Sequence, residues 1–382
     1  MDKIFVFGKA THGVNFTDRE KETTRLVSNF ENGINTILIS PRRWGKTSLV
    51  RKASRIVNEQ NGLVKVISLD GFLCRTEADF YMLFSTEIIK QTSSKWEEWI
   101  DNAKRLLSRV SPKITIGSDP INDFSLSFDI TSGTHSEHDI LDLPQKIAEE
   151  KGISIVVCID EFQQIAEFSH SKNFQKKMRS VWQLQSKVSY CLYGSKKHVL
   201  SELFSKQSMP FYKFGDVIFL QKISEKDWVK FICTRFEQSG KSISVDYATR
   251  ICQTVDCHSS YVQQLSWLVW IKTQSIVSEE NFIEALEDLF DQNKILFYRN
   301  IEELTSYQLN FLRAIINGLD SEFTKSENLK KYNLGTSANV SRLKKSLEQK
   351  EIVDIAGKKV SIQDPVFKLW LKNEMIVSNS NE

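Results

Sequence analysis

Short apolar runs alternate with longer amphipathic stretches over the first 220 residues. The run at 153–159 is aliphatic and β-branched without polar alternation, which is typical of a strand buried on both faces of a parallel sheet. The longer stretches have the spacing of amphipathic helices. Strands are predicted at 37–39, 64–69, 153–159, 188–193 and 217–220. Residues 1–220 are therefore predicted to form an α/β core domain.

Residues 111–136 interrupt this alternation. Prolines and glycines punctuate the segment, and apolar and polar residues alternate at 124–130. The pattern predicts a β-hairpin inserted between the second and third core strands. The insertion is a candidate for contact with a partner, although insertions of this kind can also be decorative.

The remainder of the chain is mainly helical. Four helical periods predict a small helical domain at 221–300, with helices at 224–238, 245–255, 259–275 and 279–293. Residues 301–382 then predict three helices and two short strands, the arrangement of a winged helix-turn-helix domain. The predicted helices are at 305–317, 325–333 and 336–349.

Composition indicates an ordinary globular protein of 382 residues, with 41% hydrophobic and 26% charged residues. The 51 basic and 48 acidic residues leave a net charge of +3, too small to argue for nucleic acid or an acidic partner. Six scattered cysteines without a C-x-x-C pair suggest neither a zinc site nor a disulfide framework. No run approaches the roughly 18–20 apolar residues of a membrane span. Reduced thiols and the absence of a leader pattern predict a cytoplasmic protein without membrane contact.

The strongest chemical signal is Gly45-Lys46-Thr47, which follows the first strand and precedes a helical stretch. Strand, tight loop and helix in this order are the context of a phosphate-binding loop. Amide groups at a helix start form an anion site, Lys46 can reach the β- and γ-phosphates, and the Thr47 hydroxyl can bind Mg²⁺. Gly45 is expected to leave room for the phosphates. Ser40 stands where the pattern usually begins with glycine.

This loop predicts a nucleotide-binding segment of nine residues. An exposed turn with a surface lysine is the alternative interpretation. The predicted nucleotide contacts are Ser40, Pro41, Arg42, Arg43, Trp44, Gly45, Lys46, Thr47 and Ser48.

Two adjacent carboxylates end the buried strand at 153–159. Asp160 is the candidate for the Mg²⁺ side of the site, and Glu161 is the candidate base that activates the attacking water. The two acids could instead only begin a helix and interact with its dipole. Together with the loop at 40–48, they favour catalysis.

Two further polar positions are candidates for the site. Ser195 follows the fourth strand, where ligands of such sheets gather, so it could sense the γ-phosphate or position water. An ordinary Gly-Ser turn is the alternative. His258 precedes a helix with Ser259 or Ser260 as its N-cap, and it could meet an anion or only pack.

The third helix of the predicted winged helix carries residue types that could reach bases or phosphates: Asn339, Arg342, Lys344 and Lys345. Residues 301–382 hold 12 basic and 11 acidic residues, however, whereas a DNA-binding domain usually has a strongly basic face. DNA contact is possible, and a protein-docking or lid role is favoured.

Several landmarks in order resemble the archaeal/bacterial ATPase family, in the STAND branch of the AAA+-related P-loop ATPases. The stretch at 16–20 resembles its F-x-G-R-E opening, and Ser-Pro-Arg-Arg-Trp-Gly-Lys46-Thr47 resembles its phosphate loop. Asp160-Glu161-Phe-Gln resembles its D-E-F-Q strand end, and Gly194-Ser195 its sensor turn. Asp364-Pro-Val-Phe-Lys-Leu-Trp-Leu resembles its closing motif. The likeness spans nearly the whole chain.

The resemblance implies a P-loop core with strand order 5-1-4-3-2, a helical lid and a winged helix. It also implies switching between ATP and ADP, with Phe16 and Arg19 near adenine and ribose and His258 on the lid. The turn at 257–259 lacks the family's glycine and proline, and Lys213-Phe214 replaces its arginine.

These observations predict a Mg²⁺-dependent ATP-binding switch that hydrolyses ATP slowly. Glu161, Lys46 and Ser195 are the predicted catalytic residues, and Thr47 and Asp160 the predicted metal ligands. Fast turnover could require a protein partner, which the sequence does not identify. A DNA-binding regulator and a non-hydrolysing nucleotide-bound scaffold are the alternatives.

Overall fold

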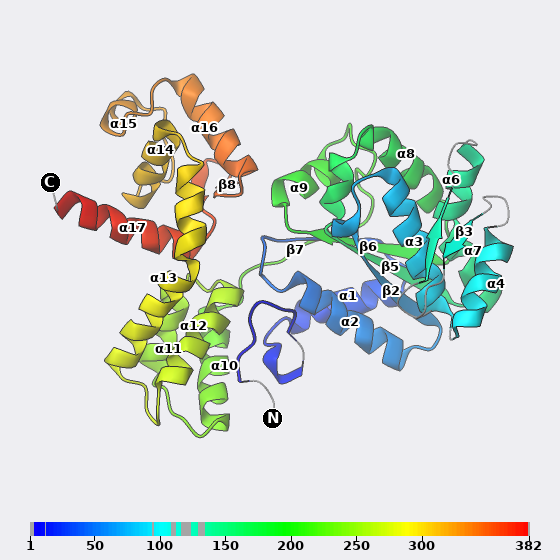
Figure 1. Ribbon diagram of the computed structural model, residues 1–382, viewed down its shortest axis with the longest axis horizontal. Helices are drawn as coiled ribbons and strands as arrows, with labels where there is room; N and C mark the ends of the chain where they lie inside the picture. Colours follow the sequence, from blue (N-terminus) through cyan, green and yellow to red (C-terminus); the bar gives the residue numbers. More distant parts are fainter. Residues whose placement is uncertain are drawn as a thin grey trace. The chain divides into compact units, whose positions relative to one another are not determined.

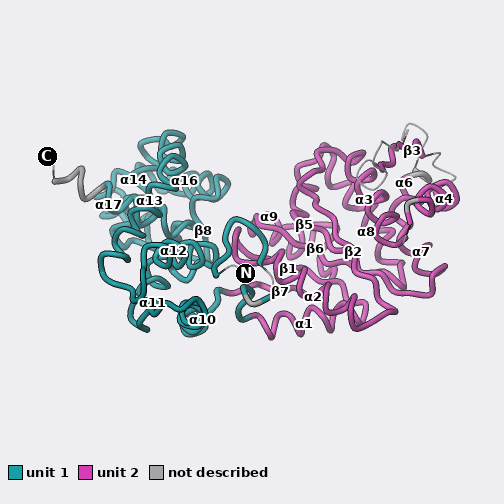
Figure 2. Tube along the Cα trace, turned by 60° about the horizontal axis from the view of Figure 1, so that its bottom comes forward, with its two compact units in different colours: residues 1–18, 222–382 teal, residues 19–221 magenta. Residues whose placement is uncertain are grey.

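The computed structural model describes residues 4–11, 13–93, 95–107, 112–115, 124–128 and 134–380. The chain divides into two compact units (Figure 2): unit 1 comprises Met1–Asp18 and Lys222–Glu382, and unit 2 comprises Arg19–Gln221. Each has its own hydrophobic core. Residues 1–18 were predicted to belong to the P-loop core, whereas the structure groups them with the C-terminal part of the chain.

Unit 2 is built around a parallel sheet. Its described residues form five strands in the order β2-β5-β6-β1-β7. When the core strands are numbered 1 to 5 along the chain, this order reads 5-1-4-3-2 from the β7 edge. The predicted order is therefore confirmed. Figure 1 shows α1 and α2 on one face of the sheet and α3 and α8 on the other. The strands are β1 (Thr36–Ile39), β2 (Val64–Asp70), β5 (Ser154–Asp160), β6 (Val188–Gly194) and β7 (Asp216–Phe219).

The register of these strands brings their carboxyl ends to one edge. Ile39 is paired with Gly194, and Asp70 is paired with Asp160. Loops that leave the sheet at this edge are therefore close in space, which is where open α/β sheets bind ligands.

Two helices of unit 2 were not predicted from the sequence, one at Thr134–Leu141 and one at Lys197–Ser205. The helices are α1 (Glu20–Glu31), α2 (Lys46–Gln60), α3 (Glu77–Thr92), α4 (Trp96–Leu106), α6 (Thr134–Leu141), α7 (Leu143–Lys151), α8 (Ser171–Trp182) and α9 (Lys197–Ser205), with 3-10 turns η2 (Gly71–Leu73) and η5 (Phe162–Glu167).

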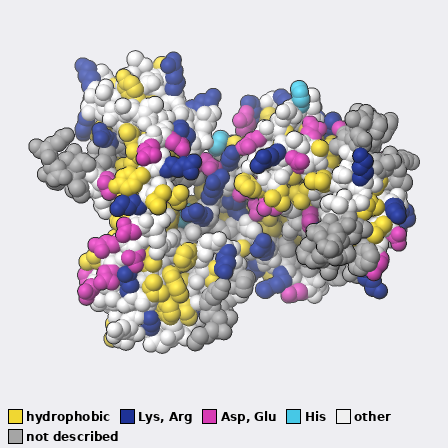
Figure 3. Space-filling model, in the orientation of Figure 1, with side chains coloured by type: hydrophobic (Ala, Val, Ile, Leu, Met, Phe, Trp, Pro, Cys, Tyr) yellow, Lys and Arg dark blue, Asp and Glu magenta, His cyan; other side chains and the backbone are white. Residues whose placement is uncertain are grey.

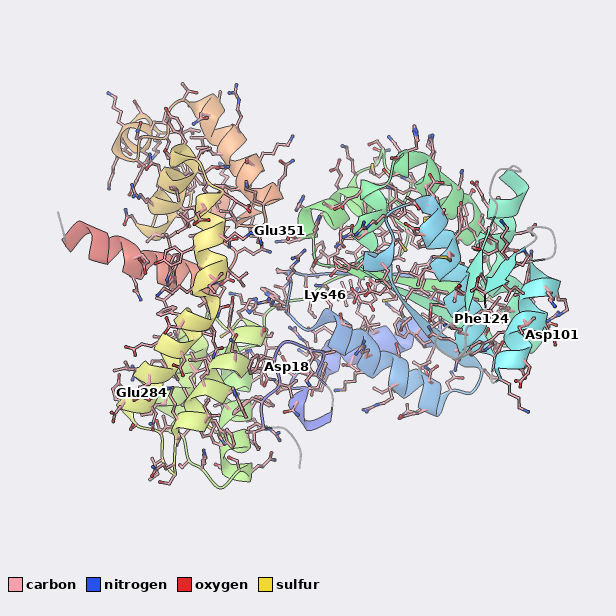
Figure 4. All side chains as sticks on the ribbon, viewed as in Figure 1. Asp18, Lys46, Asp101, Phe124, Glu284 and Glu351 are labelled. Carbon is pink, nitrogen blue, oxygen red and sulfur yellow. The ribbon has the colours of Figure 1, made fainter. Side chains whose placement is uncertain are left out.

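The described part of the insertion contains two antiparallel strands, β3 (Lys113–Thr115) and β4 (Ser125–Ser127). Phe124, labelled in Figure 4, is buried, and its ring lies 5.3 Å from that of Trp99. The segment between these strands lies outside the described residues.

Unit 1 begins with the 3-10 turn η1 (Gly13–Asn15) and continues through four long helices. Arg235 fastens the N-terminal segment to them, donating to the carbonyl of Ile4 at 2.8 Å and to Oδ1 of Asn15 at 3.2 Å. The four helices are α10 (Glu225–Gln238), α11 (Val245–Thr254), α12 (Ser259–Lys272) and α13 (Glu279–Glu302).

The C-terminal part of unit 1 has the predicted winged-helix arrangement of three helices and a two-stranded antiparallel wing. A further helix, α17, follows the wing. Helix α13 passes the predicted boundary at residue 300 without a break. The elements are α14 (Ser306–Ile316), α15 (Ser326–Lys331), α16 (Ser337–Gln349), β8 (Val353–Ala356), β9 (Lys359–Ile362) and α17 (Pro365–Ser380).

Among the helices that the structure describes, none has both the length and the hydropathy needed to cross a bilayer.

Candidate functional site

The loop between β1 and α2 has two residues in the left-handed region of backbone space. Gly45 has φ = 93° and Arg43 has φ = 62°. A Cβ added at Gly45 would meet no protein atom within 4 Å, so the backbone conformation requires the glycine there, and protein packing does not. The predicted room for phosphates at Gly45 stays a prediction.

Lys46 begins α2 and is held over its own loop (Figure 4). Its side-chain ammonium donates to the backbone carbonyls of Ser40 at 3.2 Å and Pro41 at 3.0 Å. The residue is 6% exposed. The loop is therefore folded around the cation that the sequence analysis assigned to phosphate binding.

The loop and the acidic strand end meet through side chains. Oγ1 of Thr47 donates to Oδ2 of Asp160 at 2.8 Å, and the backbone amide of Glu161 donates to Oδ1 of Asp160 at 2.8 Å. Burial raises the pKa of Asp160, and these two hydrogen bonds oppose the rise. A hydroxyl and a carboxylate are hard oxygen donors, and Mg²⁺ is usually bound by one or two protein oxygens with phosphate and water oxygens. The donor set therefore fits Mg²⁺.

Glu161 follows Asp160 with left-handed backbone dihedrals, φ = 48° and ψ = 38°. Its Oε2 accepts a hydrogen bond from Oγ of Ser195 at 2.9 Å and another from Nε2 of Gln163. Nε of Arg42 donates to the same Ser195 hydroxyl at 3.4 Å. A chain of contacts thus runs from the phosphate loop through Ser195 to the predicted base.

Arg19 also reaches the loop. It is the N-cap residue of α1, it pairs with Glu22 at 3.1 Å, and its guanidinium donates to the carbonyl of Trp44 at 3.4 Å. The side chain is nearly buried. Arg19 therefore contacts the phosphate loop, and its predicted contact with nucleotide stays a prediction.

Two predicted residues belong to unit 1, so their roles at a nucleotide also stay predictions. Phe16 lies in the N-terminal segment, after η1. His258 is itself the N-cap of α12, with Ser259 as the first helical residue, so the predicted serine cap was wrong. The histidine ring lies 4.9 Å from the ring of Tyr261.

No role was predicted for Gln163 or Gly194, although both lie in motifs of the sequence that resemble the ATPase family. Gln163 donates to Glu161, and it is 1% exposed. A Cβ at Gly194 would lie 1.8 Å from Oε1 of Gln163. The sequence did offer one indication of a role for Gln163, namely an amide side chain directly after a buried strand that ends in two acids. A buried amide needs a specific hydrogen-bond partner, and the acids are close to it in sequence.

Comparison with known families matches residues 295–373 to a model described as "Probable winged helix domain". The C-terminal part of this chain is a winged helix. No curated protein matches the chain as a sequence.

Solved structures resemble the chain over almost its full length. The Walker-type ATPase PABY2304 of Pyrococcus abyssi has a TM-score of 0.69 and 17% identity, covering 97% of this chain and 100% of the other. The Aeropyrum pernix ORC2 protein, in its ADPNP–ADP complexes, has a TM-score of 0.59 and 15% identity, covering 99% and 98%. At these identities the likeness shows the fold: a P-loop core followed by a helical region and the winged helix.

Proposed function

We propose that the chain binds ATP with Mg²⁺ at the loop of residues 40–48, hydrolyses it slowly and acts as a nucleotide-controlled switch. The 2.8 Å hydrogen bond between Thr47 and Asp160 carries this proposal. It joins the two segments that a P-loop ATPase needs side by side, although 113 positions separate them in the sequence.

Phosphate binding is assigned to the start of α2. The first N–H groups of a helix have no intrahelical partner, and the helix dipole adds partial positive charge there. Lys46 supplies a full positive charge at the same point, and two of the groups to which it donates are neutral backbone carbonyls. An anionic phosphate is a stronger partner for an ammonium than a carbonyl is, so we expect Lys46 to exchange them when ATP binds.

Thr47 and Asp160 are the residues that would hold Mg²⁺. The ion neutralises negative charge on the phosphates when it is bound. Asp160 must be ionised to act as a ligand, and its raised pKa makes that more difficult at low pH.

Glu161 is assigned as the general base. It accepts the proton of the attacking water as the water oxygen bonds to the γ-phosphorus, and ADP leaves with the electron pair of the broken bond. Ser195 donates to Glu161 and accepts from Arg42, which places it between the base and the loop, where it can read the γ-phosphate.

Slow turnover follows from the residues that stand in place of an arginine. Lys213-Phe214 occupies the position of the family's arginine, so this chain lacks the planar, bidentate guanidinium that such an arginine would offer to the transition state. We assign the protein to the STAND branch on the motifs at 16–20, 40–47, 160–163, 194–195 and 364–371, which resemble those of that family. The ORC2 protein was solved both in ADPNP–ADP complexes and in an ADP form, which is consistent with a fold that holds either nucleotide.

The test is ATP binding and phosphate release by Lys46→Ala. We expect ATP affinity to fall about 100-fold, because the loss of a charge-assisted phosphate contact costs about 2–3 kcal/mol. Arg55→Ala is the matched control, since Arg55 lies on the same helix with 58% of its side chain exposed. Titration calorimetry that finds equal affinity in the two variants would remove Lys46 from the site. Wild-type protein that binds ATP without releasing phosphate would favour a scaffold.

A second candidate function is duplex binding by the winged helix, favoured by the exposed Arg342 and Lys345 on α16. It predicts binding that weakens steeply with salt and on joint replacement of both residues by alanine. Figure 3 shows basic side chains at separate places on the drawn side of this region, with acidic ones among them. A gel-shift assay at two salt concentrations decides it.

A further inference from the structure

The candidate base is held by a residue to which neither the motifs nor the comparisons give a role. Nε2 of Gln163 donates to Oε2 of Glu161, two positions earlier in the chain. Gln163 lies in the 3-10 turn η5, directly after the left-handed backbone of Glu161. This turn directs both side chains to the carboxyl edge of the sheet.

The orientation of the Gln163 amide is fixed by charge. An amide oxygen beside the carboxylate would be repelled, so the NH₂ group must face Glu161. Oε1 then points the other way, and it has no hydrogen-bond partner among the described residues. A buried acceptor without a partner costs about 1–3 kcal/mol. The buried Oε1 of Gln163 therefore lowers the stability of the fold, while Nε2 of the same amide donates a hydrogen bond to the candidate base.

Gly194 provides the space for this amide. A Cβ at Gly194 would lie 1.8 Å from Oε1 and 2.9 Å from Cδ of Gln163, closer than packed atoms approach. The φ of Gly194 is not in the left-handed region, so its backbone does not require glycine. A methyl group at this position would therefore displace the Gln163 amide, which lies against the glycine.

The two donors to Glu161 act on a single carboxylate oxygen. Ser195 and Gln163 both bind Oε2, and Oε1 of Glu161 has no partner in the described part of the chain. One oxygen is therefore anchored from two directions while the other is left to accept a proton. Ser195 is also contacted by Arg42 of the phosphate loop, whereas Gln163 is independent of that loop.

We propose that Gln163 is a positioning residue that fixes the Glu161 carboxylate for ATP hydrolysis, with Gly194 as its seat. The inference rests on the proposed function, because it requires Glu161 to act as the base. Among the described residues, the Gln163 side chain is hydrogen-bonded to Glu161 and not to Lys46, Thr47 or Asp160. Its loss should therefore lower kcat and leave nucleotide affinity intact.

The decisive variant is Gln163→Met, which keeps the shape of the side chain and removes both the donor and the unpartnered acceptor. We expect kcat to fall about 10- to 100-fold, because small displacements of a catalytic group have effects of this size. We expect unchanged ATP affinity and a Tm that is not lowered. Gln164→Met is the matched control, since Gln164 is the next residue of the same turn and is half-buried. It should behave as wild type.

Loss of activity together with a lower Tm and weaker ATP binding would show a merely structural role and overturn the proposal. Wild-type turnover in Gln163→Met would overturn it too, while leaving the ATPase assignment in place. Wild-type protein that releases no phosphate would overturn both.

A double-mutant cycle tests the seat. Gly194→Ala should lower both Tm and kcat, because its methyl group displaces the amide. Adding Gln163→Ala should restore Tm by making room for that methyl group, while kcat stays low because the donor is absent. Additive changes in Tm would show that the two residues are not coupled and would contradict the seat.

Discussion

The end of strand β5 carries two adjacent acids, whereas helix α16 carries an amide and several basic residues, and the two regions place their polar side chains differently. At β5, Asp160 and Glu161 are bound by side chains from the phosphate loop and from the end of β6. On α16, Asn339 donates to the carbonyl of Leu334 at 2.9 Å within its own turn, and Lys344 lies 4.9 Å from the centre of the buried Phe323 ring. At the end of β5, polar groups from separate segments of the chain converge, whereas these two residues of α16 contact the loops that surround the helix.

This difference separates a site from architecture. When polar groups converge at a sheet edge they lose contact with water, and burial of a charged group is unfavourable. Burial raises the pKa of Asp160 for this reason. On α16, Asn339 and Lys344 have partners nearby in the winged helix, which explain these two residues without any ligand. We therefore assign chemistry to the β5 edge first.

The largest effect is expected for Glu161→Gln, which tests whether the end of β5 is a catalytic site. Removing the base should lower ATP turnover about 10²- to 10⁴-fold, which is the usual contribution of general base catalysis. ATP affinity should be retained, because the phosphate contacts are assigned elsewhere. Single-turnover phosphate release and calorimetry measure the two quantities. Equal turnover in this variant and wild type would exclude Glu161 as the base.

Asp160→Asn should lower Mg²⁺-dependent ATP binding about 10- to 100-fold, in line with other changes around metal sites. It should also raise the free energy of unfolding at neutral pH. Because the folded-state pKa of Asp160 is raised, its carboxyl favours folding below its unfolded pKa, and that contribution is lost as the pH rises through the folded pKa. The stability gain from asparagine should therefore appear above the folded pKa and be absent in acid.

Denaturant unfolding at acidic and neutral pH, without Mg²⁺, tests this sign. A gain that is largest in acid would contradict the cause assigned to the pKa shift.

The smallest effect is expected on α16. Lys344→Ala should lower the free energy of unfolding by about 0.5–1 kcal/mol, because the cation covers the Phe323 ring. Lys345→Ala, on an exposed neighbour, should stay within about 0.5 kcal/mol of wild type. Thermal unfolding of the two variants measures the difference. A larger loss for Lys345 would show that the packing assignment on α16 is wrong.

The sheet could be predicted because its strands are short apolar runs and parallel neighbours need helical crossovers. The pairing of Thr47 with Asp160 followed from the same logic, since both segments leave the sheet at its carboxyl edge. The expectation that Thr47 and Asp160 lie close together did not depend on the structure of the residues between them in the sequence.

The contact of Gln163 with Gly194 could not be predicted. It depends on the left-handed turn at Glu161 and on the register that places Gly194 beside it, and neither leaves a periodic signal. The helix at Thr134–Leu141 was missed for a related reason, because a short helix beside an insertion has little amphipathic pattern to detect.

Helix α13 joins the four-helix region to the winged helix as a single rod of 24 residues, about 36 Å long. Phe297 near its end lies 5.4 Å from Trp370 of α17, and Tyr261 of α12 donates to Asp364 at 2.6 Å. Over this length, a tilt of about 5° at one end of the helix displaces the other end by about 3 Å. Small rotations of α13 within unit 1 would therefore be measurable as displacements of the winged helix.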